Sequence, residues 1–171
     1  NLKGANLAGA DLRRAILEGA NLEGANLEGA NLKYAQLDSA NLGGARLAGA
    51  DLAQADLSEA YLGAVKAHGT ILSRASLRTA KLEEADLTGA KLDEAVLYAA
   101  TLRNVVLKRA SLEEADFSQA RLYAVDFSEA DLRRAVWKGT QAEDCVPSGA
   151  RVHRAELVDA KFVRTVAAFL D

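Results

Sequence analysis

The chain has 171 residues, the length of one domain, and half of them are hydrophobic although only 5% are aromatic. Irregular globular cores use large aromatic side chains to fill space, so a core made mostly of Leu and Ala must be narrow and regular. The net charge of −3, from 21 basic and 24 acidic residues, argues against a general nucleic-acid-binding protein, which would carry a basic excess. A single cysteine excludes an intramolecular disulfide, and no apolar run approaches the length of a membrane span.

A five-residue period runs from Leu2 to about Thr165 without insertion or deletion. Of the 27 positions five residues apart between Leu2 and Leu132, 24 hold Leu, and a small residue stands two positions before each of these centres. The three exceptions among the centres are Ala67, Phe117 and Phe127. Helices repeat apolar residues every 3.6 positions and strands every 2, so neither explains this period. A square coil does, because each repeat then forms one side and returns two side chains to the interior.

Repeats such as 20–24 (ANLEG) and 50–54 (ADLAQ) resemble the A(D/N)LXX pattern of the pentapeptide-repeat family, and the resemblance covers nearly the whole chain. It implies an all-β fold, a right-handed quadrilateral parallel β-helix of about eight coils at four repeats to a coil. Residues 20 apart should then stack in neighbouring coils. We expect residues 1–165 to form this solenoid, less regular from about residue 136. Residues 166–171 are expected to form a C-terminal cap or tail, such as a short capping helix.

The corners of the coil carry a second pattern. Eleven of the 13 glycines lie two positions after a centre, which predicts a positive φ at that position. The enrichment is strong up to Gly49 and weak afterwards, where charged residues take the position. We therefore predict that the turn type changes along the rod, with the glycine-bearing turns first. The Asn and Asp residues that precede many centres are expected to accept hydrogen bonds from nearby backbone rather than to bind ligands.

The repeat loosens after Leu132. Trp137 stands at a centre one coil from Phe117 on the same side, and the two rings are predicted to stack inside the core. Pro147 also stands at a centre, and because proline cannot donate a ladder hydrogen bond we predict the loss of one bond between coils there.

Residues with catalytic chemistry are few and separated. His68 and His153 each follow a centre, so both are expected to point outward on different sides, about four coils apart. Cys145 occupies a small inward position and is expected to replace Ala in the core. A catalytic site needs convergent side chains, and a reactive thiol needs a cationic neighbour. The sequence therefore predicts no catalytic, metal-binding or cofactor-binding residues, and a protein that is not an enzyme.

Function on such a rod is expected on its outward residues. We number the four sides by their centres, the first starting at Leu2, the second at Leu7, the third at Leu12 and the fourth at Leu17. The fourth side is acidic, with seven acidic and two basic residues, and the third carries arginines at both ends. Exposed Tyr and apolar residues collect in the middle and later coils, and Tyr is favoured at interfaces. The residues predicted for a protein-interaction surface are Tyr61, Val96, Tyr98, Tyr123, Arg133, Arg134, Arg151 and Arg154.

The main functional hypothesis is a non-catalytic scaffold that binds another protein or neighbouring domains of its own chain. The family resemblance implies an alternative, a DNA mimic that binds type II topoisomerases such as gyrase and forms a homodimer through its C-terminal end. A third reading is an adaptor or effector segment of a bacterial secretion system. No direct nucleic-acid or membrane partner is expected. The chain lacks Met and opens in repeat register, so we expect it to be part of a longer protein, with a cytoplasmic location.

Overall fold

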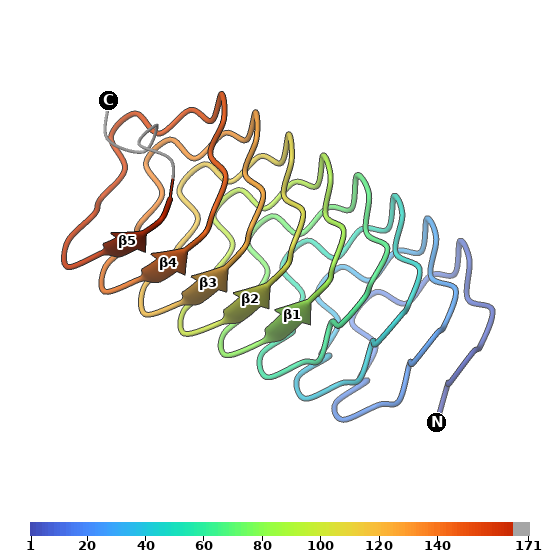
Figure 1. Cartoon of the computed structure of the whole chain (residues 1–171). Coiled ribbons are helices and arrows are strands. Elements are labelled where there is room, and N and C mark those ends of the chain that lie inside the picture. The colour runs from blue at the N-terminus through green and yellow to red at the C-terminus, as the bar shows by residue number, and fades with distance from the viewer. Residues whose placement is uncertain (166–171) are drawn as a thin grey trace.

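The computed structural model describes residues 1–165, which form a rod of stacked four-sided coils with the first and last described residues at opposite ends of the rod (Figure 1). Every coil pairs in parallel with the coil 20 residues further on, from Asn6↔Asn26 to Val136↔Glu156. The described residues therefore make about eight coils, which confirms the predicted quadrilateral parallel β-helix. The cap predicted at residues 166–171 lies outside the described residues.

Backbone hydrogen bonds join each coil to the next at three places in each repeat. The N–H of Leu22, a centre, donates to the carbonyl of Asn41 at 2.7 Å, and the N–H of Gly24 donates to that of Gly43 at 2.8 Å. The residue before a centre donates in the opposite direction, as the N–H of Asn41 does to Ala20 at 2.9 Å. These bonds satisfy the backbone of a chain that would otherwise leave many polar groups unpaired. The carbonyl that would pair with position 147 belongs to residue 166, so the bond lost at Pro147 stays a prediction.

The first side flattens into a five-stranded parallel sheet in the second half of the rod (Figure 1). Its strands are three residues long and lie in the order β1-β2-β3-β4-β5, with residues 20 apart in register, as in Leu82↔Leu102. The strands are β1 (Lys81–Glu83), β2 (Thr101–Arg103), β3 (Arg121–Tyr123), β4 (Gln141–Glu143) and β5 (Lys161–Val163). The other three sides pair through single bridges only.

The predicted change of turn type along the rod is wrong at three of the four corners, and a change occurs only at the corner that follows the first side. The residue two positions after a centre keeps a positive φ in every repeat, for example +65° at Gly4 and +60° at Glu114, so losing glycine does not change this angle. Its N–H must point along the rod to reach the next coil, which requires the same backbone whatever the side chain. What changes is the turn hydrogen bond: Ala45 N–H donates to Leu42 at 2.9 Å, whereas the corresponding bond is absent from the described residues at Val65 and after β1–β5.

Side-chain size accounts for most of these open turns, although the turn after β1 is open with Ala85 in the inward position. Residues larger than Ala occupy the inward position after the first side at Val65, Val105, Val125, Cys145 and Thr165, all in the later coils. Their extra volume widens this corner, because a close-packed interior tolerates little added bulk. The centre and its neighbours then stay extended and form the strands. Glycine at the turn position of this side ends at Gly44, before the first open turn.

The interior is filled by stacked ladders of Leu and Ala, which are almost completely buried from Leu22 to Ala135. Four aromatic rings replace Leu near the C-terminal end. Trp137 stacks on Phe117 with 4.7 Å between ring centroids and 20° between planes, which confirms the predicted pair. Phe127 packs edge-on against both rings, and Phe162 lies 5.8 Å from Trp137. Ring pairs at these distances add stability beyond their buried area.

The core has an under-filled position at Ala67. Leu occupies the equivalent position in both neighbouring coils, at Leu47 and Leu87, and a cavity of about 10 Å³ lies beside Ala67. We expect Ala67→Leu to raise the free energy of unfolding by about 0.5–2 kcal/mol, as cavity-filling substitutions commonly do. Urea denaturation followed by circular dichroism measures this change. A variant less stable than the parent would show that the site is already closely packed.

Candidate protein-interaction surface

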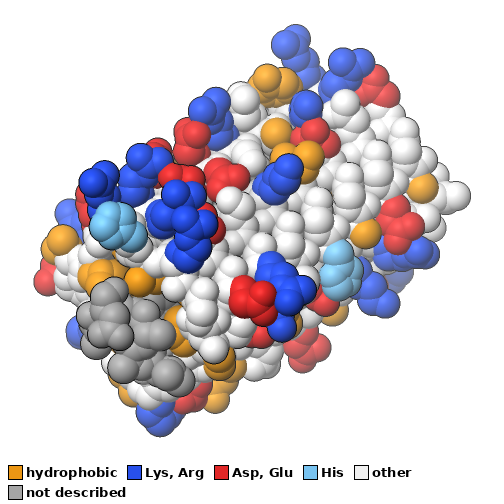
Figure 2. Space-filling view, turned by 90° about the horizontal axis from the view of Figure 1, so that it is seen from above, with side chains coloured by type: hydrophobic (Ala, Val, Ile, Leu, Met, Phe, Trp, Pro, Cys, Tyr) orange, Lys and Arg blue, Asp and Glu red, His pale blue; other side chains and the backbone are white. Residues whose placement is uncertain are grey.

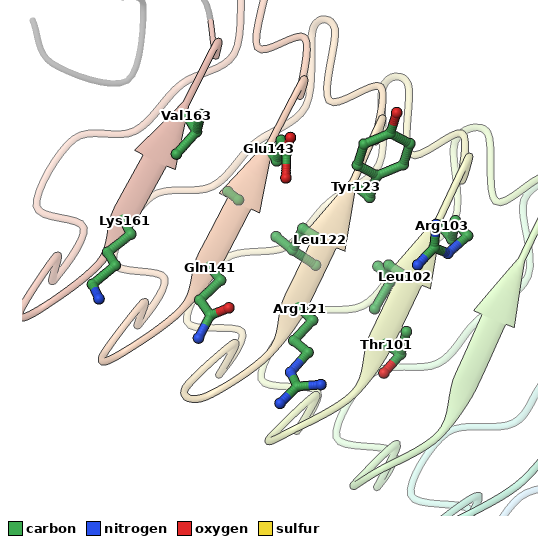
Figure 3. A pocket seen from close by; sticks show the side chains of 11 residues that line it. Thr101, Leu102, Arg103, Arg121, Leu122, Tyr123, Gln141, Glu143, Lys161 and Val163 are labelled. Carbon is green, nitrogen blue, oxygen red and sulfur yellow. The ribbon is translucent and has the colours of Figure 1, made fainter.

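A shallow groove lies on the outer face of the sheet, across strands β2 to β5 (Figure 3). Its volume is about 390 Å³. Residues before and after each centre form its two walls, because side chains alternate between the faces of a strand and the centres point into the core. One wall is formed by Thr101, Arg121, Gln141 and Lys161, and the other by Arg103, Tyr123, Glu143 and Val163.

The groove has a net positive charge. Among the described residues, Arg103, Arg121 and Lys161 form no ion pair, although most other arginines of the rod do. The acidic wall residue Glu143 is engaged by Arg164, which also bonds Asp144 at 2.8 Å through Nε. The side-chain hydrogen bond from Arg164 holds the pKa of Asp144 below its usual value. The groove therefore offers three cations that form no ion pair with a described carboxylate.

Two tyrosines shape this side of the rod. Tyr123 lies in the wall, 39% exposed, with the Arg103 guanidinium 5.3 Å from its ring centroid. Tyr61 lies two coils before β2 and crosses the side above Gly43 and Gly63. A Cβ at Gly63 would stand 2.2 Å from the Tyr61 hydroxyl, so a larger residue there would require the exposed ring to move. These two glycines are the pair that do not occupy a turn position, and Tyr61 explains both.

The remaining predicted surface residues lie on other sides. Val96 and Tyr98 are on the fourth side, where Tyr98 is 40% exposed and the Arg78 guanidinium lies 5.6 Å from its ring centroid. Val96 is half-buried. The structure therefore does not bring the eight predicted residues into one surface. It distributes them over three sides, and the arginines Arg133, Arg134, Arg151 and Arg154 all lie on the third.

Three of these arginines belong to an ion-pair network between coils. Arg133 donates to Asp131 through Nε at 2.8 Å and Nη2 at 2.7 Å, and Nη2 also reaches Glu113 at 3.0 Å. Arg134 bonds Glu113 and Glu114, and Arg151 reaches Asp131 at 3.3 Å. Similar ion pairs join residues of neighbouring coils elsewhere, as Arg74 with Glu94 and Arg109 with Glu129. Basic and acidic side chains lie next to one another over the face seen in Figure 2. The network joins neighbouring coils, so these arginines have partners within the chain.

The network predicts a pH-dependent stability. The side-chain hydrogen bond from Arg133 lowers the pKa of Asp131 below its ordinary value, against the opposing effect of partial burial. A lowered native pKa contributes stability above the unfolded pKa of about 3.9, and this contribution is lost as the pH falls through the native pKa. We expect Arg133→Gln to be less stable than the parent at pH 7 and the difference to shrink below about pH 4. Urea titrations across pH measure it, with Arg154→Gln as the unpaired control. A difference that does not vary with pH would contradict the assignment.

The fourth side has the opposite charge. Its acidic residues form no ion pair within the described part of the chain. They are Glu18, Asp38, Asp56, Glu59, Asp116, Glu156 and Asp159. The oxygens of Asp56 and Asp116 do accept backbone hydrogen bonds at 2.9 and 2.8 Å, as do most Asn and Asp residues before a centre. This confirms the structural role predicted for that position.

The two histidines and the cysteine occupy the outward and inward positions that their places in the repeat predict. His68 and His153 are exposed on the second and third sides. Cys145 is buried, and burial raises the pKa of its thiol to about 11. Within residues 1–165 no group of three His, Cys, Asp or Glu side chains is arranged to hold a metal ion. Nor does this part of the chain contain a helix long and apolar enough to cross a membrane.

Comparison with known proteins decides the family. The model of pentapeptide repeats matches the chain in eight copies, which span residues 1–33 and, in overlapping segments, 35–137. The chain belongs to the pentapeptide repeat family. No curated protein matches this family member significantly.

Several solved structures of pentapeptide repeat proteins are similar. HetL of the cyanobacterium Nostoc, involved in heterocyst differentiation regulation, is 32% identical, with 91% of this chain and 75% of HetL covered at a TM-score of 0.46. A pentapeptide repeat protein of the Arabidopsis thaliana thylakoid lumen is 25% identical. The match covers 54% of this chain and 64% of that protein, at a TM-score of 0.53. Trypsin-treated QnrB1, a plasmid-mediated fluoroquinolone resistance protein, is 18% identical. The match covers 94% of this chain and 78% of QnrB1, at a TM-score of 0.52. At this identity the likeness to QnrB1 shows the fold alone.

Proposed function

We propose that this pentapeptide repeat protein is a non-catalytic scaffold that binds another protein, or neighbouring domains of its own chain, through the outer surface of the rod. The observation that carries the proposal is the groove on the first side, with three cations that form no described ion pair on a wall whose backbone is hydrogen-bonded to the neighbouring coils. A rigid surface loses little entropy when a partner binds. The packed interior also supports it, because a cavity of about 10 Å³ is too small for a reaction chamber.

Affinity capture combined with a turnover assay tests this function. The chain is immobilised and incubated with extract of its source organism, and the bound proteins are identified by mass spectrometry. We expect a small set of proteins that free chain displaces, and no change in a metabolite mixture incubated with the purified protein. Failure to capture any displaceable protein, together with catalytic turnover of a metabolite, would overturn the proposal.

The unpaired acidic residues of the fourth side favour a second candidate, a mimic of duplex DNA that binds a type II topoisomerase. An array of carboxylates that form no described ion pair resembles the phosphates that such an enzyme binds. Arg78 and Lys138 interrupt this array in its middle and later coils, which weakens the candidate. A gyrase supercoiling assay with a fluoroquinolone tests it. If the chain protected gyrase from the fluoroquinolone and Glu59→Lys abolished this protection, DNA mimicry would be favoured. If the fluoroquinolone inhibited gyrase equally with and without the chain, DNA mimicry would be excluded.

A further inference from the structure

One wall of the groove, continued by one strand beyond the groove to β1, carries cations at a regular interval. On the first side, the residues before the centres of β1, β3 and β5 are Lys81, Arg121 and Lys161, and those of the intervening strands are Thr101 and Gln141. Neighbouring coils lie about 4.8 Å apart, so the three cations repeat at about 9.6 Å along the rod. All three are exposed, and none forms an ion pair with a described residue. The row therefore presents evenly spaced positive charge over about 19 Å.

This interval matches one backbone conformation closely. A polyproline II helix has three residues per turn and a rise of about 3.1 Å per residue, so every third side chain lies on the same face, about 9.3 Å from the last. Carboxylates at every third residue would meet the three cations in turn. In a β-strand, every second side chain shares a face at about 6.6–6.8 Å, which does not match the interval.

The groove must recognise a ligand through side chains. The backbone N–H groups of its floor already bond the neighbouring coils, as Thr101 does with Ala80 and Arg121 with Ala100, both at 2.9 Å. No strand edge is available along this side, so a partner cannot add a strand to the sheet there. A polyproline II segment suits this surface, because its backbone needs no hydrogen bonds from a partner. Tyr123 and Val163 on the opposite wall supply the apolar contact that such segments make with aromatic-lined grooves.

We infer that the groove binds an extended acidic segment of a partner protein, in polyproline II conformation along the rod axis, with carboxylates at every third residue on Lys81, Arg121 and Lys161. This inference rests on the proposed scaffold function and specifies its partner. Arg121, at the centre of the row, binds a carboxylate with two parallel hydrogen bonds. Arg103 stacks on Tyr123 and adds a further cation to the other wall. A single-stranded nucleic acid is disfavoured, because the groove offers one aromatic ring for stacking and the whole chain carries −3.

Fluorescence anisotropy with synthetic peptides tests the inference. The probe is a labelled peptide of three Glu-Pro-Pro triplets, and its controls are the Gln-Pro-Pro peptide and a peptide of the same composition with its three Glu residues adjacent. We expect the Glu-Pro-Pro peptide to bind at low ionic strength, the Gln-Pro-Pro peptide not to bind, and the block peptide to bind more weakly. Equal binding of the triplet and block peptides would contradict the spacing, and tighter binding of oligothymidylate would overturn the choice of a protein segment.

Matched variants locate the binding. Arg121→Glu should weaken binding at least about tenfold, the effect of losing one charged hydrogen-bonding partner. Lys91→Glu makes the same charge change on the third side, at an exposed residue without an ion pair, and should change affinity by less than about twofold through long-range charge alone. Circular dichroism checks that both variants fold. Equal affinity of Arg121→Glu and the parent would reject the groove. If affinity capture still returned a displaceable protein, the scaffold function would stand while this inference failed.

Discussion

The substitution Leu92→Asp is expected to unfold the middle of the rod at neutral pH, with a loss of more than about 4 kcal/mol in the free energy of unfolding. Leu92 is completely buried between Leu72 and Leu112 of the neighbouring coils. An isolated carboxylate placed there would have neither water nor a cation to stabilise it. Each coil is stabilised mainly by its neighbours, so the defect weakens the coils on both sides of it.

The adjacent residue provides a matched control. Lys91→Asp introduces the same side chain one position earlier, where the residue is exposed and forms no described ion pair. Surface substitutions of this kind usually change stability by less than about 0.5 kcal/mol. Urea denaturation followed by circular dichroism compares the two variants. Similar stabilities would contradict the assignment of inward and outward positions on which every surface described above depends.

Trp137→Ala is expected to cost about 3–5 kcal/mol, the usual range for removing a large buried aromatic side chain. The ring is fully buried and lies against Phe117, Phe127 and Phe162. Because the cluster lies near the C-terminal end of the rod, the loss should appear as early unfolding of the last coils while the first coils remain folded.

Hydrogen exchange and denaturation by urea measure this effect, and two variants control it. Lys138→Ala changes the exposed neighbour and should leave stability within about 0.5 kcal/mol of the parent. Trp137→Leu restores the residue found at Leu97 and Leu157 on the same side and should cost less than Trp137→Ala. If Trp137→Ala were as stable as Lys138→Ala, the aromatic cluster would not contribute to holding the last coils.

Most of the fold could be predicted from the five-residue period, because in a solenoid the position of a residue in its repeat determines its direction. The inward Leu and Ala ladders, the stack of Phe117 and Trp137, and the backbone hydrogen bonds of the Asn and Asp side chains all follow from that position. The location of the open turns does not follow from the position of a residue in its five-residue repeat. A second period of 20, which places Val65, Val105, Val125, Cys145 and Thr165 after the same side, indicates most of the open turns but not the one at Ala85.

The candidate site was harder to predict for the same physical reason. Tyr61 and Tyr123 were identified as surface residues, and both lie on the first side. The repeat position already placed Val96 and Tyr98 on the fourth side, but counting exposed residues could not show that Arg133 is paired within the chain. The groove depends on contacts between neighbouring coils. These contacts are the ion pairs that charged side chains form and the position of the Tyr61 ring over glycine. Once each residue is assigned to a side, the sequence shows that the cations at 81, 121 and 161 lie 40 residues apart on the first side.

Site-resolved photo-cross-linking tests the central claim, that the working surface of the rod is the groove on its first side. A photoreactive amino acid replaces Thr101 in the groove, Lys91 on the third side or Lys138 on the fourth, and each protein is irradiated in extract of its source organism. We predict one dominant protein adduct from position 101, reduced by excess Glu-Pro-Pro peptide, and little from positions 91 and 138. A dominant adduct from position 91 or 138 with none from position 101 would contradict the account.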